Sequence, residues 1–291
     1  MSVPAKVITA LPTPFALDEA LDPGSATALF TAVRDRGVDG VFVAGTTGEF
    51  TALDDAERIE VIRLALDVFG PEGVYAHVGA AAPRQAESLV RASVAAGATR
   101  LAAITPYFLP SPEDAMVRYY ERLVAAAGDA EVHAYLFRAR STTPADPSVL
   151  RRLHEAGVRG VKISGESDES VAAYLARAPE GFDVLSGNDI AFEEFVRAGG
   201  LGVVSGVSSV FPTPFVALRD ALNSGDVEGV RAAQPLVERA VAAVKSGSIP
   251  HLKAGLEVQG ISAGPARVCG DAVSEADLEV LKETARALAL A

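Results

Sequence analysis

Short apolar runs rich in β-branched residues alternate along this chain with longer segments in which apolar residues recur every three or four positions. The short runs predict buried strands, and the longer segments predict amphipathic helices. The predicted strands cover residues 6–11, 40–45, 74–79, 100–106, 132–137, 158–164, 182–187 and 201–207. The predicted helices that separate and follow them cover residues 25–36, 54–69, 83–96, 112–127, 147–156, 168–177, 190–198 and 212–224. This regular alternation is typical of a parallel sheet built from βα units.

Glycine ends four of the predicted helices, and a strand begins within a few residues of each; these are Gly37, Gly97, Gly157 and Gly199. Glycine supplies the left-handed backbone that closes a helix, so these joins resemble one repeated βα unit. Eight such units predict an α/β fold, the (β/α)8 TIM barrel. An open doubly wound sheet is the alternative, although the chain has neither a GxGxxG nor a Walker A sequence to favour it.

After residue 226 the pattern is helical only, with helices predicted over 226–246, 249–258 and 274–290. We therefore expect two parts in this chain. Residues 1–225 would form the barrel domain that carries the chemistry, and residues 226–291 would form a C-terminal helical extension packed on the barrel.

Composition narrows the classes of function. A formal net charge of −12 repels nucleic acid and anionic membrane surfaces, so a small-molecule substrate is expected. Cys269 is the only cysteine, which excludes an intrachain disulfide, and the four histidines do not have the spacing of a metal site. No apolar run is long enough to span a bilayer, and the first residues do not resemble an export signal, so a cytoplasmic protein is expected.

Lys162 is the strongest candidate for chemistry, because it lies within the otherwise apolar strand sequence GVKIS. Strands of a parallel barrel are covered on both faces, so a lysine that points inward is desolvated. Desolvation disfavours the charged form of a lysine and frees its lone pair to attack a carbonyl and form a Schiff base. The alternative is a lysine near a strand end whose amine reaches water.

Two further segments are predicted at the same end of the barrel, where the carboxyl ends of the strands carry the active site. Tyr135 ends the strand before that of Lys162, and its phenol could move protons; the alternative is a packed tyrosine. The sequence GTTGEF (45–50) follows the second strand, and its hydroxyl and backbone groups could bind a carboxylate. The alternative is an ordinary loop whose threonines cap locally.

Together these segments resemble the dihydrodipicolinate synthase and N-acetylneuraminate lyase family over nearly the whole chain. The matching segments are ALPTPF (10–15), GVFVAGTTGEFTAL (40–53), ITPYF (104–108), residues 135–140, GVK (160–162), LSGND (185–189) and AGGLGVVSGVSS (198–209). The resemblance implies that Lys162 forms an imine with pyruvate or another 2-keto acid. It also implies an enzyme that uses neither metal nor organic cofactor and assembles as a homotetramer, a dimer of dimers.

The resemblance assigns roles to other residues as well. Thr46 and Thr47 would hold the keto-acid carboxylate and join the proton relay, and Tyr135 would be the general acid and base. The backbone of Gly187 and Val204 would line the imine pocket.

The chain departs from the family pattern at four places. Phe108 stands where a synthase has a relay tyrosine that is supplied by a neighbouring subunit. Either Tyr107 is repositioned to replace that tyrosine, or water replaces its hydroxyl, or the chemistry does not need this proton relay. After Tyr135 the usual Asn-x-Pro is replaced, so that Arg138 stands at the proline position, as a second anchor or a surface residue. Arg140 remains at the position of an arginine that binds a distal carboxylate. After the imine lysine, the usual Lys-Glu-x-Ser-Gly is shortened to Lys-Ile-Ser-Gly (162–165). After the eighth strand, Ser209 stands in place of an asparagine.

The sequence therefore predicts a Schiff-base lyase, an aldolase or a dehydratase, with a 2-keto-3-deoxy sugar acid as the leading substrate class. A true dihydrodipicolinate synthase, which condenses pyruvate with aspartate semialdehyde, is the alternative within the family. A non-catalytic sensor that binds keto acids is the alternative from another class.

Overall fold

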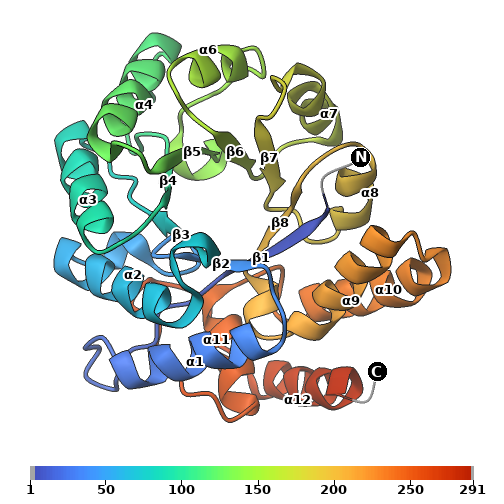
Figure 1. Ribbon diagram of the computed structural model, residues 1–291. Helices are drawn as coiled ribbons and strands as arrows, with labels where there is room; N and C mark the ends of the chain where they lie inside the picture. Colours follow the sequence, from blue (N-terminus) through green and yellow to red (C-terminus); the bar gives the residue numbers. More distant parts are fainter. Residues whose placement is uncertain (1–3, 290–291) are drawn as a thin grey trace.

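Each strand pairs in parallel with the next, and β8 pairs back onto β1, so the sheet closes into a barrel that Figure 1 shows along its axis. The computed structural model describes residues 4–289. The strands are β1 (Lys6–Ala10), β2 (Gly40–Val43), β3 (Val74–His77), β4 (Arg100–Ile104), β5 (Glu131–Leu136), β6 (Gly160–Ile163), β7 (Asp183–Ser186) and β8 (Gly202–Ser205). The predicted (β/α)8 barrel is confirmed, and the open sheet is excluded.

Helices surround the barrel in chain order (Figure 1). They are α1 (Pro23–Asp35), α2 (Asp55–Phe69), α3 (Pro83–Ala95), α4 (Glu113–Ala127), α5 (Arg138–Ser141), α6 (Val149–Glu155), α7 (Asp168–Arg177), α8 (Phe192–Arg197), α9 (Pro212–Ser224), α10 (Val227–Ala243), α11 (Ile249–Val258) and α12 (Glu275–Ala289). Short 3-10 helices are η1 (Phe50–Ala52), η2 (Pro71–Gly73) and η3 (Val207–Ser209). The last helix was predicted to reach residue 290, which lies outside the described residues.

The helix boundaries agree with the sequence prediction to within a few residues, and the four glycines that follow helices have left-handed φ angles between 81° and 102°. The predicted strands extend too far at their carboxyl ends. β2 ends at Val43 because Ala44 has a φ of 50°, which turns the chain out of the sheet. The single turn α5 was not predicted, because a four-residue helix has too little periodicity to detect.

Alternate residues of the strands face two different cores. One core lies between the strands and the outer helices and holds most of the buried valine, leucine and alanine. The other fills the barrel interior, where Ile8, Phe42, Tyr75, Tyr135 and Val204 pack together. A barrel of eight strands has an interior that side chains fill, so a polar group placed there must point toward the open end.

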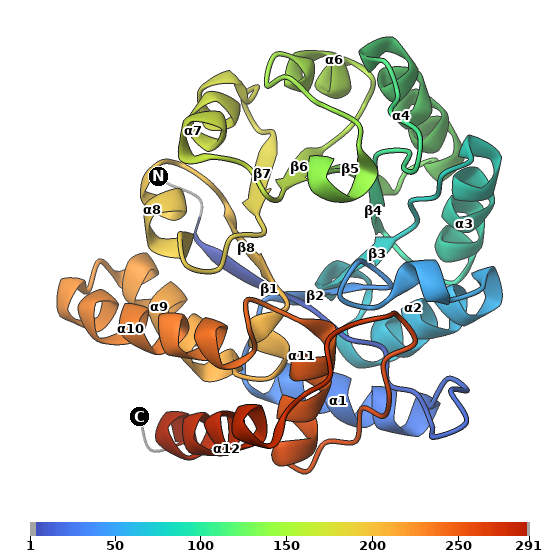
Figure 2. The same ribbon diagram turned by 180° about the vertical axis from the view of Figure 1, so that it is seen from behind.

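The chain after the barrel returns to the open end of the barrel. α10 packs on α9, α12 packs on α11, and α11 contacts η3 directly after β8. In Figure 2 the short helix α5 and the chain that follows α11 both lie on the side that faces the viewer. Among residues 4–289, no helix is both long and apolar enough to cross a membrane.

Candidate active site

Lys162 lies in the middle of β6, and its neighbours in register are Tyr135 on β5 and Leu185 on β7. Both neighbours belong to the interior core, so Lys162 also points into the barrel. Its Nζ lies 3.9 Å from the centre of the Tyr135 ring and 5.0 Å from that of Phe42, and the residue is 8% exposed. The amine is therefore held against two aromatic rings in a site that excludes most water.

Thr46 joins this pair from the turn that follows β2. Its hydroxyl lies 3.4 Å from the Tyr135 hydroxyl, a distance at which either group can donate to the other. The turn is closed by its own backbone bonds, from Glu49 N–H to Thr46 O and from Phe50 N–H to Gly45 O. We call residues 45–50 the threonine turn. Because it is rigid and short, it brings Thr46 to β5 from 89 residues away.

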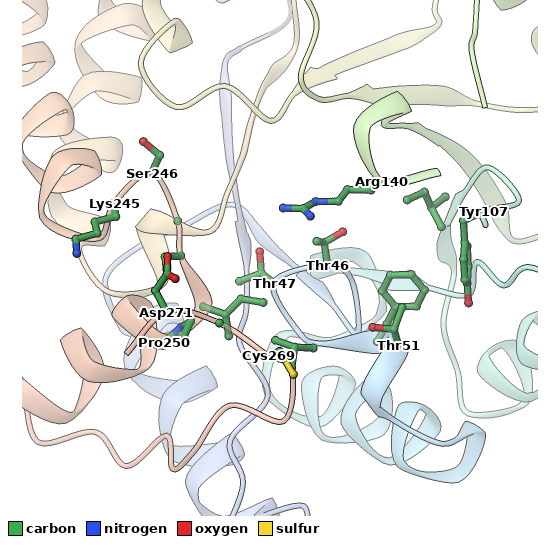
Figure 3. A pocket seen from close by; sticks show the side chains of 17 residues that line it. Thr46, Thr47, Thr51, Tyr107, Arg140, Lys245, Ser246, Pro250, Cys269 and Asp271 are labelled. Carbon is green, nitrogen blue, oxygen red and sulfur yellow. The ribbon is translucent and has the colours of Figure 1, made fainter. Parts of the chain in front are cut away.

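Thr46 lines a pocket of about 550 Å³, whereas Lys162 and Tyr135 are not among its lining residues. Its lining comprises three groups: the threonine turn with Thr51, the end of β4 with Tyr107 and Arg140, and the C-terminal residues Lys245, Ser246, Gly247, Ser248, Ile249, Pro250, Val268, Cys269, Gly270 and Asp271. Figure 3 shows Arg140 extending from α5 toward Thr46 and Thr47. The predicted binding residues Thr47, Tyr107 and Arg140 are thus brought to one cavity, together with Thr46.

The C-terminal wall of this pocket, residues 245–250 and 268–271, was not predicted from the sequence. Its residues lie beyond the last strand motif, which ends at residue 209, and no pattern in them indicates a site. Lys245 does not add its charge to the pocket, because its Nζ is 2.9 Å from Asp277 and points away from Arg140 in Figure 3. Within residues 4–289, the Arg140 guanidinium has no ion pair and lies 5.8 Å from the ring of Phe137.

The two residues that depart most from the family pattern do not reach this pocket. Arg138 begins α5, is exposed and does not line the cavity. Phe108 is 85% exposed and has a φ of 77°, an unusual backbone for a phenylalanine. Tyr107, beside it, packs edge-on against Phe50 and lines the pocket.

Gly187 and Val204, which were expected to line the imine pocket, are not among the residues that line the cavity of Thr46 and Arg140. Val204 is buried in the interior core with Tyr135. Gly187 follows β7 and lines a smaller cavity with Asp189. A side chain at Gly187 would place its Cβ 2.2 Å from the Ser164 hydroxyl oxygen, so only glycine fits there.

Asp189 was quoted only as part of the SGND sequence, and its environment makes it a functional candidate. Its Oδ1 is buried and lacks a hydrogen-bond partner among the described residues. Burial raises the pKa of this carboxyl from 3.8 to about 7, although the Ser205 hydroxyl and the Lys162 charge both oppose the rise. A carboxyl that titrates near neutrality inside a cavity is typical of an active site.

His77 supports the threonine turn from behind. Its Nδ1–H donates to Ala44 O at 2.8 Å, and its Nε2 accepts the Ile104 N–H at 3.2 Å. The ring is therefore neutral, and burial together with the Arg58 charge keeps the pKa of His77 well below its ordinary value. Arg58 donates to His77 O at 2.8 Å from α2. The imidazole thus joins the ends of β2 and β4 and holds the left-handed Ala44.

This chain matches the model of the Dihydrodipicolinate synthetase family over residues 3–288. It belongs to that family. Among its relatives, an uncharacterized DapA-like lyase of Halobacterium salinarum is 34% identical over 90% of this chain and 86% of its own length. The 4-hydroxy-tetrahydrodipicolinate synthase of Mycolicibacterium paratuberculosis is 31% identical over 97% of this chain and 94% of its own length.

Solved structures share the fold of this family member. YagE, a prophage protein of the dihydrodipicolinic acid synthase family from E. coli K12, solved in complex with pyruvate, superposes with a TM-score of 0.90. Its sequence is 24% identical, and the match covers 99% of each chain. The family and its relatives make this protein an enzyme, a lyase. Among residues 4–289, no group of three or more His, Cys, Asp or Glu side chains is arranged to hold a metal ion.

Proposed function

We propose that this enzyme is a class I lyase in which Lys162 forms an imine with pyruvate or a 2-keto-3-deoxy sugar acid. The observation that carries the proposal is the grouping of the nearly buried Lys162 amine with the Tyr135 and Thr46 hydroxyls, contributed by three separate segments. An amine, a phenol and a hydroxyl in series provide a nucleophile with a path for protons.

The neutral Lys162 amine attacks C2 of the keto acid, and Tyr135 supplies the proton with which the carbinolamine hydroxyl leaves as water. In an aldolase, the C4 hydroxyl then loses its proton, and the C3–C4 bond breaks. Its electron pair forms the enamine and neutralises the iminium nitrogen, while the aldehyde departs. Protonation at C3 and hydrolysis release pyruvate. In a dehydratase, the enamine forms by loss of a C3 proton, and the C4 hydroxyl leaves as water.

The other end of the substrate would lie in the pocket beside Arg140. Thr46 and Thr47 bind the carboxylate next to the keto group, and the unpaired guanidinium binds a distal carboxylate or hydroxyl groups. A volume of about 550 Å³ leaves room for a substrate longer than pyruvate. This room supports a sugar acid as the substrate class.

The synthase activity remains the second candidate because relatives about one-third identical carry the name 4-hydroxy-tetrahydrodipicolinate synthase. Phe108 argues against it, since it stands at the position of the relay tyrosine and a phenyl ring cannot pass a proton. No observation favours a sensor without activity.

We also propose a homotetramer of this enzyme. Phe108 and Leu109 are 85% and 69% exposed on adjacent positions beside the pocket. Large apolar side chains that protrude together are typical of an interface between protein chains.

The test of the imine is reductive trapping. The purified protein is incubated with pyruvate, and separately with a six-carbon 2-keto-3-deoxy sugar acid, before borohydride is added and the adduct is located by peptide mass spectrometry. An adduct on Lys162 that is absent from the Lys162→Ala variant is expected. Full turnover by that variant, or trapping at another lysine, would overturn the proposal.

A further inference from the structure

Glu49 belongs to the threonine turn, but its carboxylate contacts the C-terminal segment, residues 263–271. The residue is 1% exposed and has a left-handed φ of 57°. Its Oε2 accepts two successive backbone N–H groups, from Arg267 at 2.7 Å and from Val268 at 2.9 Å. A buried carboxylate that accepts paired N–H donors fixes the position of the backbone that supplies them.

Lys253 of α11 completes the arrangement from the other side. Its Nζ lies 2.8 Å from Glu49 Oε1 and donates to Pro265 O at 2.6 Å, and the residue is 2% exposed. The amine also lies 4.2 Å from the centre of the Phe15 ring. Both charges of the pair therefore contact the C-terminal segment as well as each other.

The segment held in this way becomes the pocket wall immediately afterwards. Val268, bound to Glu49 through its N–H, lines the pocket, and so do Cys269, Gly270 and Asp271 (Figure 3). Thr46 and Arg140 line the same pocket. The threonine turn thus carries the Thr46 hydroxyl and also, through Glu49, bonds the segment that contributes Val268 to the lining.

We propose that Glu49 and Lys253 are positioning residues for substrate length, which act by holding residues 268–271 at a fixed separation from the threonine turn. The inference rests on the proposed function and extends it from the reacting carbonyl to the distal end of the substrate. On this proposal, a pyruvate imine at Lys162 does not contact the C-terminal wall, because Lys162 itself is not among the residues that line that pocket, and so it does not depend on the pair. A six-carbon keto acid occupies the distal part of the pocket and does depend on it.

A buried ion pair is sensitive to the loss of one partner, because the remaining charge is left without compensation. Glu49→Ala removes both the charge and the acceptor for the two N–H groups. The double variant Glu49→Gln/Lys253→Met removes both charges but keeps an acceptor oxygen and similar volumes. The double variant therefore tests whether the pair holds residues 268–271, and it leaves no buried charge without a partner. It replaces the single variant if Glu49→Ala fails to fold.

The first readout requires no substrate. Hydrogen exchange of the peptide that covers residues 265–272 is measured in the wild type and in each variant. The Arg267 and Val268 amides are expected to exchange several-fold faster in Glu49→Ala, and to a smaller extent in the double variant. Unchanged exchange would show that Glu49 does not hold the wall, and would overturn the inference.

The second readout separates substrate length from general damage. Half-saturating concentrations for trapping at Lys162 are measured with pyruvate and with a six-carbon 2-keto-3-deoxy sugar acid. For Glu49→Ala, we expect about a tenfold rise for the longer compound and less than about a twofold change for pyruvate, because only the distal contacts are displaced. An equal change for both compounds indicates a merely structural role and overturns the inference.

Glu257→Ala is the matched control. Glu257 also accepts two successive N–H groups of the C-terminal segment, from Ala263 at 2.7 Å and Gly264 at 3.1 Å, but neither residue lines the pocket. Its loss is expected to leave the ratio of the two half-saturating concentrations unchanged. A wild-type protein without any Lys162 adduct overturns the proposed function; a wild-type adduct with an unchanged ratio in Glu49→Ala overturns this inference alone.

Discussion

The Lys162 amine lies over the face of the Tyr135 ring, 3.9 Å from its centre, and the two residues are direct neighbours in the pairing of β5 and β6. In the proposed mechanism, the ring and the hydroxyl of Tyr135 have separate tasks. The ring packs against the lysine amine, whereas the hydroxyl, 3.4 Å from the Thr46 hydroxyl, moves protons.

Replacement of Tyr135 by phenylalanine separates these tasks, because it keeps the ring and removes the hydroxyl. We expect kcat to fall by roughly 10²- to 10⁴-fold, the usual contribution of a positioned acid or base. Trapping of a keto acid on Lys162 should persist, although more slowly. Steady-state kinetics and borohydride trapping of the same preparation measure the two effects, and undiminished turnover would remove Tyr135 from the proton path.

Arg140 is predicted to bind the distal end of the substrate, and Arg138 provides its control. Arg140→Ala should raise KM for a six-carbon keto acid by about tenfold or more, the usual loss for one charge-assisted contact, and should leave pyruvate trapping nearly unchanged. Arg138→Ala removes the same charge two positions earlier, outside the pocket, and should behave as wild type. Equal effects of the two substitutions would reduce the role of Arg140 to general electrostatics.

Asp189 should make stability depend on pH. Burial raises the pKa of its carboxyl from 3.8 to about 7, so the folded protein holds this proton more tightly than the unfolded chain does. The stabilisation is complete below the unfolded value and is lost as the pH rises through the folded one. Asp189→Asn should therefore melt higher than wild type at about pH 8, with a smaller difference at about pH 4.

Thermal melts of the wild type and the Asp189→Asn variant between about pH 4 and pH 8 test this prediction. A difference in melting temperature that does not vary with pH would mean that Asp189 is ionised throughout. Activity of the same variant then shows whether the protonated form takes part in turnover.

His77 should contribute to both stability and rate, because it supports Ala44 at the start of the threonine turn. His77→Ala leaves the Ala44 carbonyl and the Ile104 N–H without partners, which costs about 1–3 kcal/mol for each buried group that stays unpaired. Since the pKa of His77 is lowered by burial first and by Arg58 second, its stabilisation is present above pH 6.5 and is lost as the pH falls.

Denaturant unfolding at neutral and acidic pH measures this contribution. We expect the gap between wild type and His77→Ala to narrow as the solution becomes acidic. A gap that widens instead would mean that the folded protein holds a charged imidazole.

The assembly should depend on the exposed pair beside the pocket. Replacing Phe108 and Leu109 by serine should lower the mass seen by sedimentation and leave the monomer folded, since neither side chain packs in the core. Leu17→Ser is the control for the loss of exposed apolar area, because Leu17 is 95% exposed and lies on a different loop. An unchanged mass in the Phe108 and Leu109 variant would place the interface elsewhere.

The sequence by itself determined the architecture and the candidate for the reacting residue. Each strand or helix leaves its own hydrophobic pattern in the local sequence, because one face or both faces of the element are buried. The alternation of short β-branched runs with helix-periodic segments therefore predicted the order of the elements and the closed barrel. Lys162 was identifiable because a charge within an apolar strand conflicts with its neighbours. GTTGE and Tyr135 were identifiable because they lie at or near the carboxyl ends of predicted strands, and SGND was identifiable through the family resemblance.

Only the tertiary structure decided how the rest of the site is built. The C-terminal wall, with its anchors Glu49 and Lys253, joins positions about two hundred residues apart, and such pairing leaves no local pattern. The burial of Asp189 and the two-sided bonding of His77 also depend on packing, since the same residues on a surface would be ordinary. Local sequence specifies which strands form; the environment of each side chain arises only when the barrel closes.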